Sequence, residues 1–500
     1  MTAGSNLADV QLADADAWPV PGPALASDSA SRTIFLSVPA GHHVADLIRG
    51  PFLPALLAGR PRPRVVVVSP FASDPDLVDE LTKLGVGCVS LPDIRVGRAA
   101  RVVDSILSER FLLESGLRAV KLQRDRARML EAWWGRRALV ALKTAVCWLP
   151  VSRATWFRVA GRVTDVAAWR GLFQTYHPSL VVTATAGFLP VEMPLIYAAK
   201  RFGIPQMGID LGWDNLSSKY HTVLPVDYLA VWNETMREEA VRYHGFPADR
   251  VEVTGALPFD TYFDGVQIPS RVELLTSLGA DPARPLVTLA TAPPLVYPTT
   301  ERVVESLCRA IRGGELRVDA QLLVRVHPRD NVEFYTRFHD GRQVFVEKPF
   351  QQLDRSRGLS DLDAFTPGTH GRARLAATLA HSDVVVNFAS TTTVEAALFD
   401  TPVVNIGFDD STDLPLPLSI GRYYHYEHYR PVVETGAARI AGNVDDLVQA
   451  VRGYLANPGT DAGGRRELVN RCCTYTDGLA GGRAARWVLN TLSDTTGVLS

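Results

Sequence analysis

The sequence predicts an α/β protein made of two doubly wound, Rossmann-like domains that face each other across a cleft. Short apolar runs rich in β-branched residues alternate with helix-length segments, as buried parallel strands do. These runs form two series, which the Pro- and Asp-containing stretch of residues 279–285 separates. The length of 500 residues also exceeds what one hydrophobic core supports. We therefore expect two linked domains of this kind.

The first series contains seven candidate strands. In chain order they are Thr33–Val38, Arg64–Pro70, Gly87–Leu91, Leu180–Thr185, Ile204–Ile209, Tyr228–Trp232 and Val251–Gly255. We assign residues 33–270 to an N-terminal domain. Residues 1–32 are rich in Ala, Asp, Ser and Pro and lack the basic and apolar regions of a signal peptide, so we expect a disordered tail there.

A helical insertion is expected within this domain, over about residues 97–176. The segment contains no strand candidate and is rich in Arg and Trp. One interpretation is an arm that contacts anionic lipid or a lipid-linked acceptor. The other is an insertion with a solvated basic face and buried tryptophans. Both interpretations depend on Arg118, Lys121, Arg124, Arg126, Arg128, Trp133, Trp134, Arg136 and Arg137.

The second series contains five candidate strands. They are Leu286–Thr291, Gln321–Pro328, Gln343–Glu347, Asp383–Phe388 and Pro402–Phe408. We assign residues 281–476 to a C-terminal domain, and residues 477–500 to a helix that crosses back to the N-terminal domain.

Composition excludes several classes of function. The net charge of −2 provides no field that attracts nucleic acid, so no nucleic-acid partner is expected. The five cysteines lack zinc-like or disulfide-framework spacing, which favours a reducing compartment. No apolar run approaches the roughly 20 residues that a membrane-spanning helix requires. We expect a cytoplasmic protein whose membrane contact, if the basic insertion makes one, is peripheral and at the inner face.

A hydroxyl-rich turn follows the candidate strand Asp383–Phe388. Ser390, Thr391 and Thr392 stand where a helix is expected to begin. Ligands bind beyond the carboxyl ends of parallel strands, and helix N-termini there bind anions, so these hydroxyls predict a phosphate site. The alternative is a capping box formed by Thr392 and Glu395, in which the hydroxyls are structural.

His327 follows the candidate strand Gln321–Pro328, which would deliver it to the same edge of the sheet. Its imidazole would donate to a phosphate oxygen, and Arg325 would add positive charge. The competing interpretation is that Arg325 is paired away from the cleft and His327 caps a helix.

Polar residues also crowd two loops of the N-terminal domain. Asp210 follows a candidate strand, and Trp213, Asp214 and Asn215 come next. Either carboxylate would serve as a general base, beside a Trp that stacks on a sugar, although Asp and Asn are also ordinary turn formers. A second loop carries His42 and His43, and either is an alternative base.

Two acidic clusters, Asp74–Asp76 and Asp361–Asp363, invite a metal-binding interpretation. Neither follows a strand in the expected manner, and Pro75 indicates a turn. We predict no metal site.

The segments "RVHPRD" and "FASTTTVEAALFDTPVVNIGF" resemble the nucleotide-binding halves of bacterial GT-B transferases for surface polysaccharides and teichoic acids, including CDP-glycerol glycerophosphotransferases and some sialic acid or Kdo transferases. The stretch "GWDNLSSK…VWNE…VTGALPFD" looks like a signature of that group, and "YTDGLAGGRAARWV" is similar to its closing segment. The resemblance implies a GT-B fold in which His327, Ser390, Thr391 and Thr392 bind the donor's phosphates.

We thus expect a metal-independent glycosyltransferase that moves a sugar from a nucleotide-activated donor to a cell-surface glycan or lipid-linked acceptor, with no cofactor beyond that substrate. The expected donor site comprises His327, Arg325, Ser390, Thr391, Thr392 and Glu395. The expected base is Asp214, Asp210 or His42, and Trp213, Asn215 and His43 would contact the acceptor. The alternatives are a glycerophosphotransferase, a UDP-sugar 2-epimerase and a non-catalytic nucleotide-sugar-binding protein.

Overall fold

The computed structural model of this chain describes residues 32–92, 97–130, 142–149, 151–219, 225–263, 268–317, 319–354, 364–368, 370–410 and 414–494. Several segments on which predictions were made lie outside the described residues. They are residues 1–31 of the expected tail, Trp133, Trp134, Arg136, Arg137 and the acidic cluster Asp361–Asp363.

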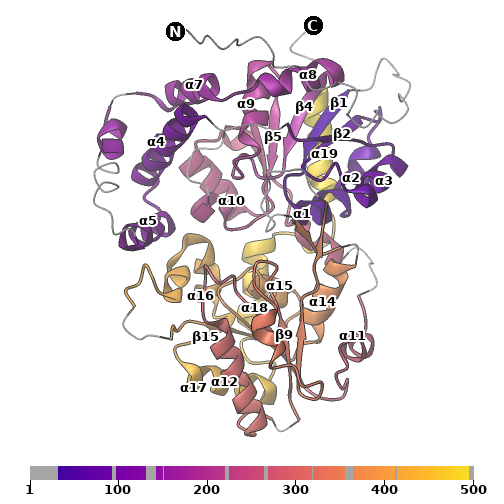
Figure 1. Ribbon diagram of the computed structural model, residues 1–500, viewed down its shortest axis with the longest axis vertical. Helices are drawn as coiled ribbons and strands as arrows, with labels where there is room; N and C mark the ends of the chain where they lie inside the picture. The colour runs from indigo at the N-terminus through magenta and orange to yellow at the C-terminus, as the bar shows by residue number, and fades with distance from the viewer. Residues whose placement is uncertain are drawn as a thin grey trace, which may run out of the picture.

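Two parallel sheets with helices on both faces form the molecule, which confirms the predicted fold class (Figure 1). The first sheet has seven strands in the order β3-β2-β1-β4-β5-β6-β7. Their bounds are β1 Thr33–Ser37, β2 Arg64–Ser69, β3 Gly87–Ser90, β4 Pro178–Thr183, β5 Gln206–Ile209, β6 Tyr228–Val231 and β7 Val251–Val253. The Val-rich centre of β2 is buried on both faces, as its sequence predicts.

The second sheet has six strands in the order β10-β9-β8-β13-β14-β15. Their bounds are β8 Leu286–Ala290, β9 Gln321–Arg325, β10 Val344–Glu347, β13 Val384–Asn387, β14 Val403–Ile406 and β15 Ala438–Ala441. A separate antiparallel pair joins β11 Gln351–Gln352 to β12 Phe365–Thr366. The sequence did not reveal β15, β11 or β12.

Helices separate the strands. In the first half they are α1 Gly41–His43, α2 Phe52–Leu57, α3 Pro75–Lys83, α4 Arg98–Ser115, α5 Arg118–Leu130, α7 Arg153–Val163, α8 Ala167–Tyr176, α9 Met193–Arg201 and α10 Glu234–Glu239. In the second half they are α11 Arg271–Leu278, α12 Thr300–Arg312, α13 Glu333–Thr336, α14 Gly371–His381, α15 Thr392–Leu398, α16 Arg430–Thr435, α17 Val444–Ala456, α18 Ala462–Cys473 and α19 Ala480–Asp494. None of the helices in the described ranges is long and apolar enough to cross a bilayer.

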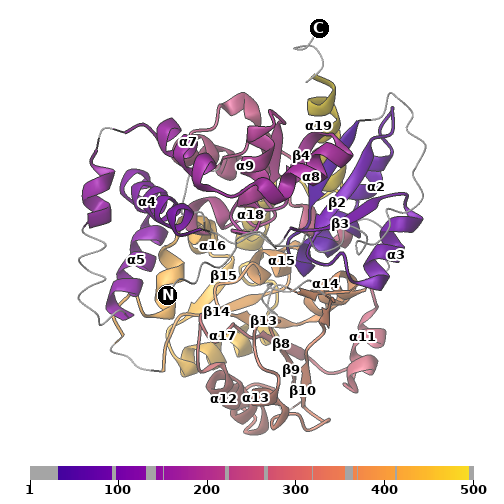
Figure 2. The same ribbon diagram turned by 45° about the horizontal axis from the view of Figure 1, so that its top comes forward.

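Two groups of helices bridge the halves of the chain. The helix α19 packs on α2, and its buried residues Ala484 and Val488 belong to the core of the first sheet. The helices α4, α5 and α7 lie to one side, and both views place α5 close to the second half of the chain (Figures 1 and 2). The 3-10 helix η8, Ile420–His425, contacts α5 there.

Each sheet has a topological switch point, where two central strands lead to connections on opposite sides. These strand pairs are β1 and β4 in the first sheet and β8 and β13 in the second. Ligands of open α/β sheets bind outside the carboxyl ends of such strands. The functional site is therefore to be sought where the two sets of strand ends meet.

Polar contacts join the two halves across this junction. Trp213 Nε1 donates to Thr391 Oγ1 at 3.0 Å, and the Tyr262 hydroxyl donates to Glu395 at 2.6 Å. Arg372 forms an ion pair with Asp46. The halves are thus held in a defined relative position.

Candidate functional site

A cavity of about 530 Å³ lies between the two sheets, at the switch point of the second. The second half of the chain contributes residues that follow β8, β9, β13 and β14, and the first half contributes residues of α5 and residues that follow β4 and β5. The polar side chains that line it are Gln123, Arg126, Asp214, Ser218, Lys219, Thr291, His327, Ser390, Thr391, Arg422 and His428, and the aromatic ones are Phe188, Trp213, Phe388, Tyr423 and Tyr426.

The hydroxyl-rich turn after β13 lies on the wall of this cavity. Ser390 and Thr391 line it, and Ala389 before them has a φ of 50°. Thr392 lies behind them, and its hydroxyl accepts from Ser390 at 3.2 Å. The turn therefore presents two of the three predicted hydroxyls to the cavity.

The alternative capping box does not form. The N-cap of α15 is Thr391, whose side chain makes no capping bond, and Glu395 instead accepts from Tyr262. Burial raises the pKa of Glu395, although Arg372 opposes the shift. Glu395 thus lies behind the turn, at the contact between the two halves.

His327 lines the cavity just beyond the end of β9, where its sequence position predicted it. Its Nδ1 accepts from the Arg329 N–H at 3.0 Å, which assigns the proton of the neutral ring to Nε2. Burial, with the positive charges of Arg329 and Lys348, lowers its pKa to about 4. His327 is therefore a neutral imidazole held in the tautomer that donates from Nε2.

Arg325 is placed away from the cavity. It is buried, pairs with Glu347 at 2.9 Å and lies over the ring of Phe350. Glu347 also pairs with Arg374 at 2.6 Å, so its carboxylate already bridges two guanidiniums. The structure thus matches the alternative interpretation of Arg325, in which it is paired away from the cleft.

Of the predicted site residues in the loop after β5, two line the cavity and two support the loop from behind. Asp210 is buried behind the loop, where its Oδ1 accepts from Gly212 N at 3.1 Å and Asn215 Nδ2 at 2.5 Å. Burial raises the pKa of Asp210 to about 7, against those two hydrogen bonds. Trp213 and Asp214 instead line the cavity. Asp210 and Asn215 thus shape the loop that presents its neighbours.

Asp214 is the only carboxylate among the described residues that line the cavity. It pairs with Lys219 at 2.9 Å. Burial would raise its pKa, but Lys219 and His428 outweigh burial and the net shift is downward. Asp214 is therefore ionised at neutral pH.

The two histidines after β1 lie outside the lining of the cavity. His43 is buried against the ring of His42, with centroids 4.0 Å apart. The His42 side chain is exposed, and desolvation by its neighbours together with the positive charges of Arg372 and Arg329 lowers its pKa to about 3. Of the two, only His42 is accessible.

Sequence reasoning missed several lining residues. Arg422 and His428 follow β14 in a stretch that contains no candidate strand, so no strand end marks them as site residues. Arg126 was noted only as part of a basic insertion. Burial lowers the pKa of His428 to about 4, although Asp214 opposes the shift. Its ring meets Trp213 edge-on with centroids 5.2 Å apart.

The lining carries an excess of positive charge. The described lining residues include three cationic side chains, Arg126, Lys219 and Arg422, and one carboxylate, Asp214. The chain as a whole has a net charge of −2. A cationic cavity in an acidic protein favours an anionic ligand. Within the described ranges, no group of three or more His, Cys, Asp or Glu side chains is placed to hold a metal ion, and the prediction of metal independence stays a prediction.

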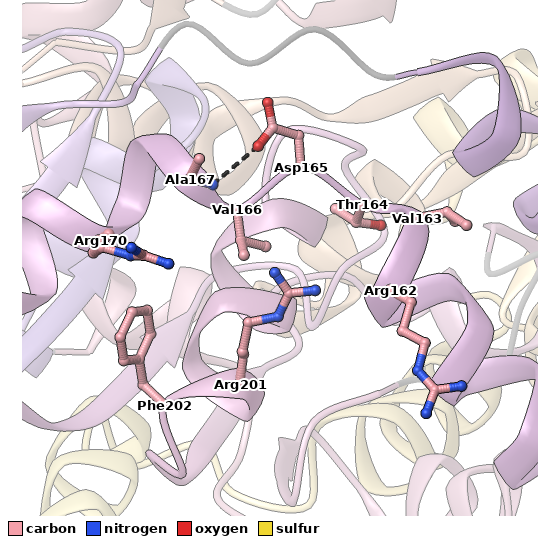
Figure 3. A pocket seen from close by; sticks show the side chains of 9 residues that line it. All are labelled: Arg162, Val163, Thr164, Asp165, Val166, Ala167, Arg170, Arg201 and Phe202. Atoms are coloured by element: carbon pink, nitrogen blue, oxygen red, sulfur yellow. Dashed lines mark hydrogen bonds between the residues drawn. The ribbon is translucent and has the colours of Figure 1, made fainter.

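A second hollow, of about 260 Å³, lies away from the sheets' junction between α7, α8 and the end of α9. Figure 3 shows Arg162 directed away from Arg170 and Arg201. Asp165 accepts from Ala167 N at 2.9 Å and already occupies the N-terminus of α8. The walls of this hollow are largely exposed, and its polar side chains do not point toward a common centre as those of the cavity do.

No protein-family model and no curated protein sequence matches the chain. Solved structures do. A putative UDP-N-acetylglucosamine 2-epimerase from Listeria monocytogenes aligns at a TM-score of 0.54 and 13% identity over 93% of this chain and 98% of that one. The S. aureus MnaA structure with UDP aligns at 0.51 and 12% over 92% and 97%. The Neisseria meningitidis UDP-GlcNAc 2-epimerase bound to UDP-GlcNAc aligns at 0.50 and 9% over 92% and 100%.

At these identities the likeness establishes the GT-B fold. It does not single out the teichoic-acid and CDP-glycerol group that the motifs resemble.

Proposed function

We propose that this protein is a glycosyltransferase that takes its sugar from a nucleotide-activated donor and transfers it to a cell-surface glycan or lipid-linked acceptor. The observation that carries the proposal is the cationic cavity at the switch point of the second sheet, where His327 and the Ser390–Thr391 turn converge. A nucleoside diphosphate is the common anionic group that such a crevice binds.

His327 and the turn would hold the donor's phosphates. Because its pKa lies near 4, His327 is a neutral imidazole at neutral pH, and its Nε2–H, fixed by the hydrogen bond at Nδ1, would donate to a phosphate oxygen. The hydroxyls of Ser390 and Thr391 add donors on the adjacent wall. Such preorganised donors stabilise the charge that develops on a leaving diphosphate.

Asp214 would act on the acceptor from the opposite wall. It is ionised and lines the cavity, so it accepts a proton from an acceptor hydroxyl as the bond to the sugar forms. Trp213, bonded through Nε1 to Thr391, would support the sugar beside the phosphates. Contact of the basic insertion with a lipid-linked acceptor belongs to the same proposal, because α5 lines the cavity with Gln123 and Arg126.

A UDP-sugar 2-epimerase is the second candidate. The structural neighbours with TM-scores of 0.50 and above include chains described as UDP-GlcNAc 2-epimerases, one bound to UDP-GlcNAc. An epimerase needs no acceptor. Incubation with UDP-GlcNAc alone would yield its 2-epimer if this candidate is correct, whereas a transferase would leave the donor intact or hydrolyse it slowly.

A thermal-shift screen tests the donor class. Binding to the native state raises the melting temperature by mass action. The ligands are CMP, CDP, UDP, GDP and ADP with their sugar conjugates, and CDP-glycerol to include the glycerophosphotransferase alternative. We expect a selective rise with one base, enhanced by its sugar conjugate. A protein that no nucleotide stabilises would contradict the proposal, and binding without turnover under any acceptor would favour a non-catalytic role.

A further inference from the structure

Two guanidiniums at the α5 end of the cavity have no carboxylate partner among the described residues. Arg422 is only 3% exposed. It donates to the carbonyls of Leu418 and Ser419 at 3.2 and 2.6 Å and to the Tyr423 hydroxyl at 3.0 Å, all of which are neutral. A buried charge without a counter-ion is costly, so Arg422 is placed to receive an anion.

Arg126 reaches the cavity from the other half of the chain. Its guanidinium donates to the carbonyl of Leu295 at 3.2 Å, again a neutral acceptor. The third cation of the lining, Lys219, differs because Asp214 pairs with it. Arg126 and Arg422 are thus the two lining cations whose charge the described part of the chain leaves uncompensated.

The helix α5 is fixed in the position that makes Arg126 line the same cavity as Arg422. Glu427 accepts from the backbone N–H groups of Arg118 and Ala119 at 2.6 and 3.1 Å, so a carboxylate of the second half caps the first turn of α5. Ala119 and Leu122 pack against Tyr426. Gln123 Nε2 donates to the Ser218 carbonyl at 2.8 Å. These contacts tie α5 to both walls, and Arg126 lies one turn beyond Gln123 on the same face.

We propose that Arg126 and Arg422 form a second anion site, which binds a phosphate or carboxylate group distinct from the donor diphosphate at the Ser390–Thr391 turn. The two arginines belong to α5 and η8, whereas the diphosphate groups belong to the ends of β8, β9 and β13. Guanidiniums suit this task because they bind such oxyanions in a bidentate manner. The proposal rests on the proposed function in one respect, that the turn holds the diphosphate. The anion belongs either to the sugar of the donor or to the acceptor.

Titration calorimetry on the full chain tests the site with two probes. Sodium phosphate, titrated into protein saturated with UDP, reports an anion site that the nucleotide leaves free. The affinity of UDP-glucuronate relative to UDP-glucose reports an acidic donor sugar. The variants are Arg126→Gln and Arg422→Gln, with Arg128→Gln as the matched control, since Arg128 lies on the same helix outside the cavity and faces Asp125 at 3.9 Å.

If the anion belongs to the acceptor, phosphate binds the UDP-saturated wild-type protein. Arg126→Gln then weakens phosphate binding at least tenfold, and Arg128→Gln leaves it unchanged.

If the anion belongs to the donor, the wild-type protein binds UDP-glucuronate at least tenfold more tightly than UDP-glucose, and Arg126→Gln abolishes this difference in affinity. If Arg422→Gln does not fold, the effect of Arg126→Gln on the binding of the two probes is sufficient to test the site. Phosphate that competes with UDP, or binding of both probes that is insensitive to Arg126, would overturn the proposal. Arg126-dependent phosphate binding in a protein that binds no nucleotide would retain this site and reject the proposed donor instead.

Discussion

The turns that follow β4 and β13, at the switch points of the two sheets, have similar backbone conformations. They differ in the group that accepts hydrogen bonds from the turn. Each contains an alanine with a positive φ, 49° at Ala186 and 50° at Ala389. Each has a glutamate six residues later, Glu192 and Glu395. Glu192 turns back into its turn, where it accepts from the N–H groups of Ala184 and Thr185 at 3.0 Å each and from the Thr185 hydroxyl.

Glu395 turns the other way. It accepts from Tyr262 across the junction, and its turn presents the Ser390 and Thr391 hydroxyls to the cavity. The first turn is thus closed by a carboxylate of the chain itself, and the second contains none. The comparison supports the assignment of the ligand's anion to the second turn, because in the first the donors of the same kind of turn are already taken by a carboxyl group of the chain.

Replacing Glu192 is expected to have the largest effect. Glu192→Ala leaves three buried donors without an acceptor, which costs roughly 3–5 kcal/mol of unfolding free energy. Glu395→Ala leaves only the Tyr262 hydroxyl and should cost less. Urea unfolding of both variants measures the difference, and equal losses would mean that the two glutamates play one structural role.

His327→Ala is expected to lower turnover by roughly 10²–10³-fold, the cost of removing one preorganised donor from a developing oxyanion. The melting temperature should change little. The control is His177→Asn, which alters the other His-Pro pair, at the end of α8 and outside the cavity, and keeps a residue type that tolerates its φ of 45°. Near-normal turnover in His327→Ala would remove the imidazole from the mechanism.

The sequence predicted the positions of some cavity residues and missed others for identifiable reasons. His327 and the Ser390–Thr391 turn follow strands, and a strand end alone places a residue at the ligand edge of a sheet. Arg325 is two residues before His327, but it is still within β9. The sequence predicts the strand that carries its partner Glu347, but not that this strand pairs with β9 and places the two side chains together.

Long-range packing determines the rest. Arg422 and His428 reach the cavity only because their loop docks on α5, some 300 residues earlier in the chain. The strand β15 was missed because its two central residues are exposed, which removes the apolar run that marked the other strands. The similarity of the two turns is likewise evident only from their backbone angles.

Asp210 provides a pH-dependent test of the first half's scaffold. Its folded pKa of about 7 lies above the ordinary value of 3.8, so the folded protein holds a proton that the unfolded chain releases between these values. The contribution of Asp210 to the free energy of unfolding is therefore complete at low pH and decreases as the pH rises. Between about pH 5 and 7 the decrease is roughly 2 kcal/mol. Asp210→Asn should flatten that part of the wild-type profile. Parallel profiles would assign the dependence to other buried carboxyls such as Glu239, whose burial raises its pKa to about 8.

The smallest expected effect is the one that separates ligand binding from helix capping at the second turn. Thr391→Val removes a hydroxyl that lines the cavity, whereas Thr392→Val removes a hydroxyl that lies behind the lining and accepts from Ser390. We expect Thr391→Val to weaken binding of the nucleotide identified in the screen roughly tenfold, the value of one hydrogen bond to a charged group, and Thr392→Val to leave affinity unchanged. Thr391→Val also removes the acceptor of Trp213 Nε1, so it should lose more stability than Thr392→Val, and the deciding readout is affinity. A purely structural role of the hydroxyls predicts equal affinities. A tenfold difference in affinity between adjacent threonines would instead place the ligand's anion at the turn that, unlike its counterpart after β4, has no carboxylate of its own.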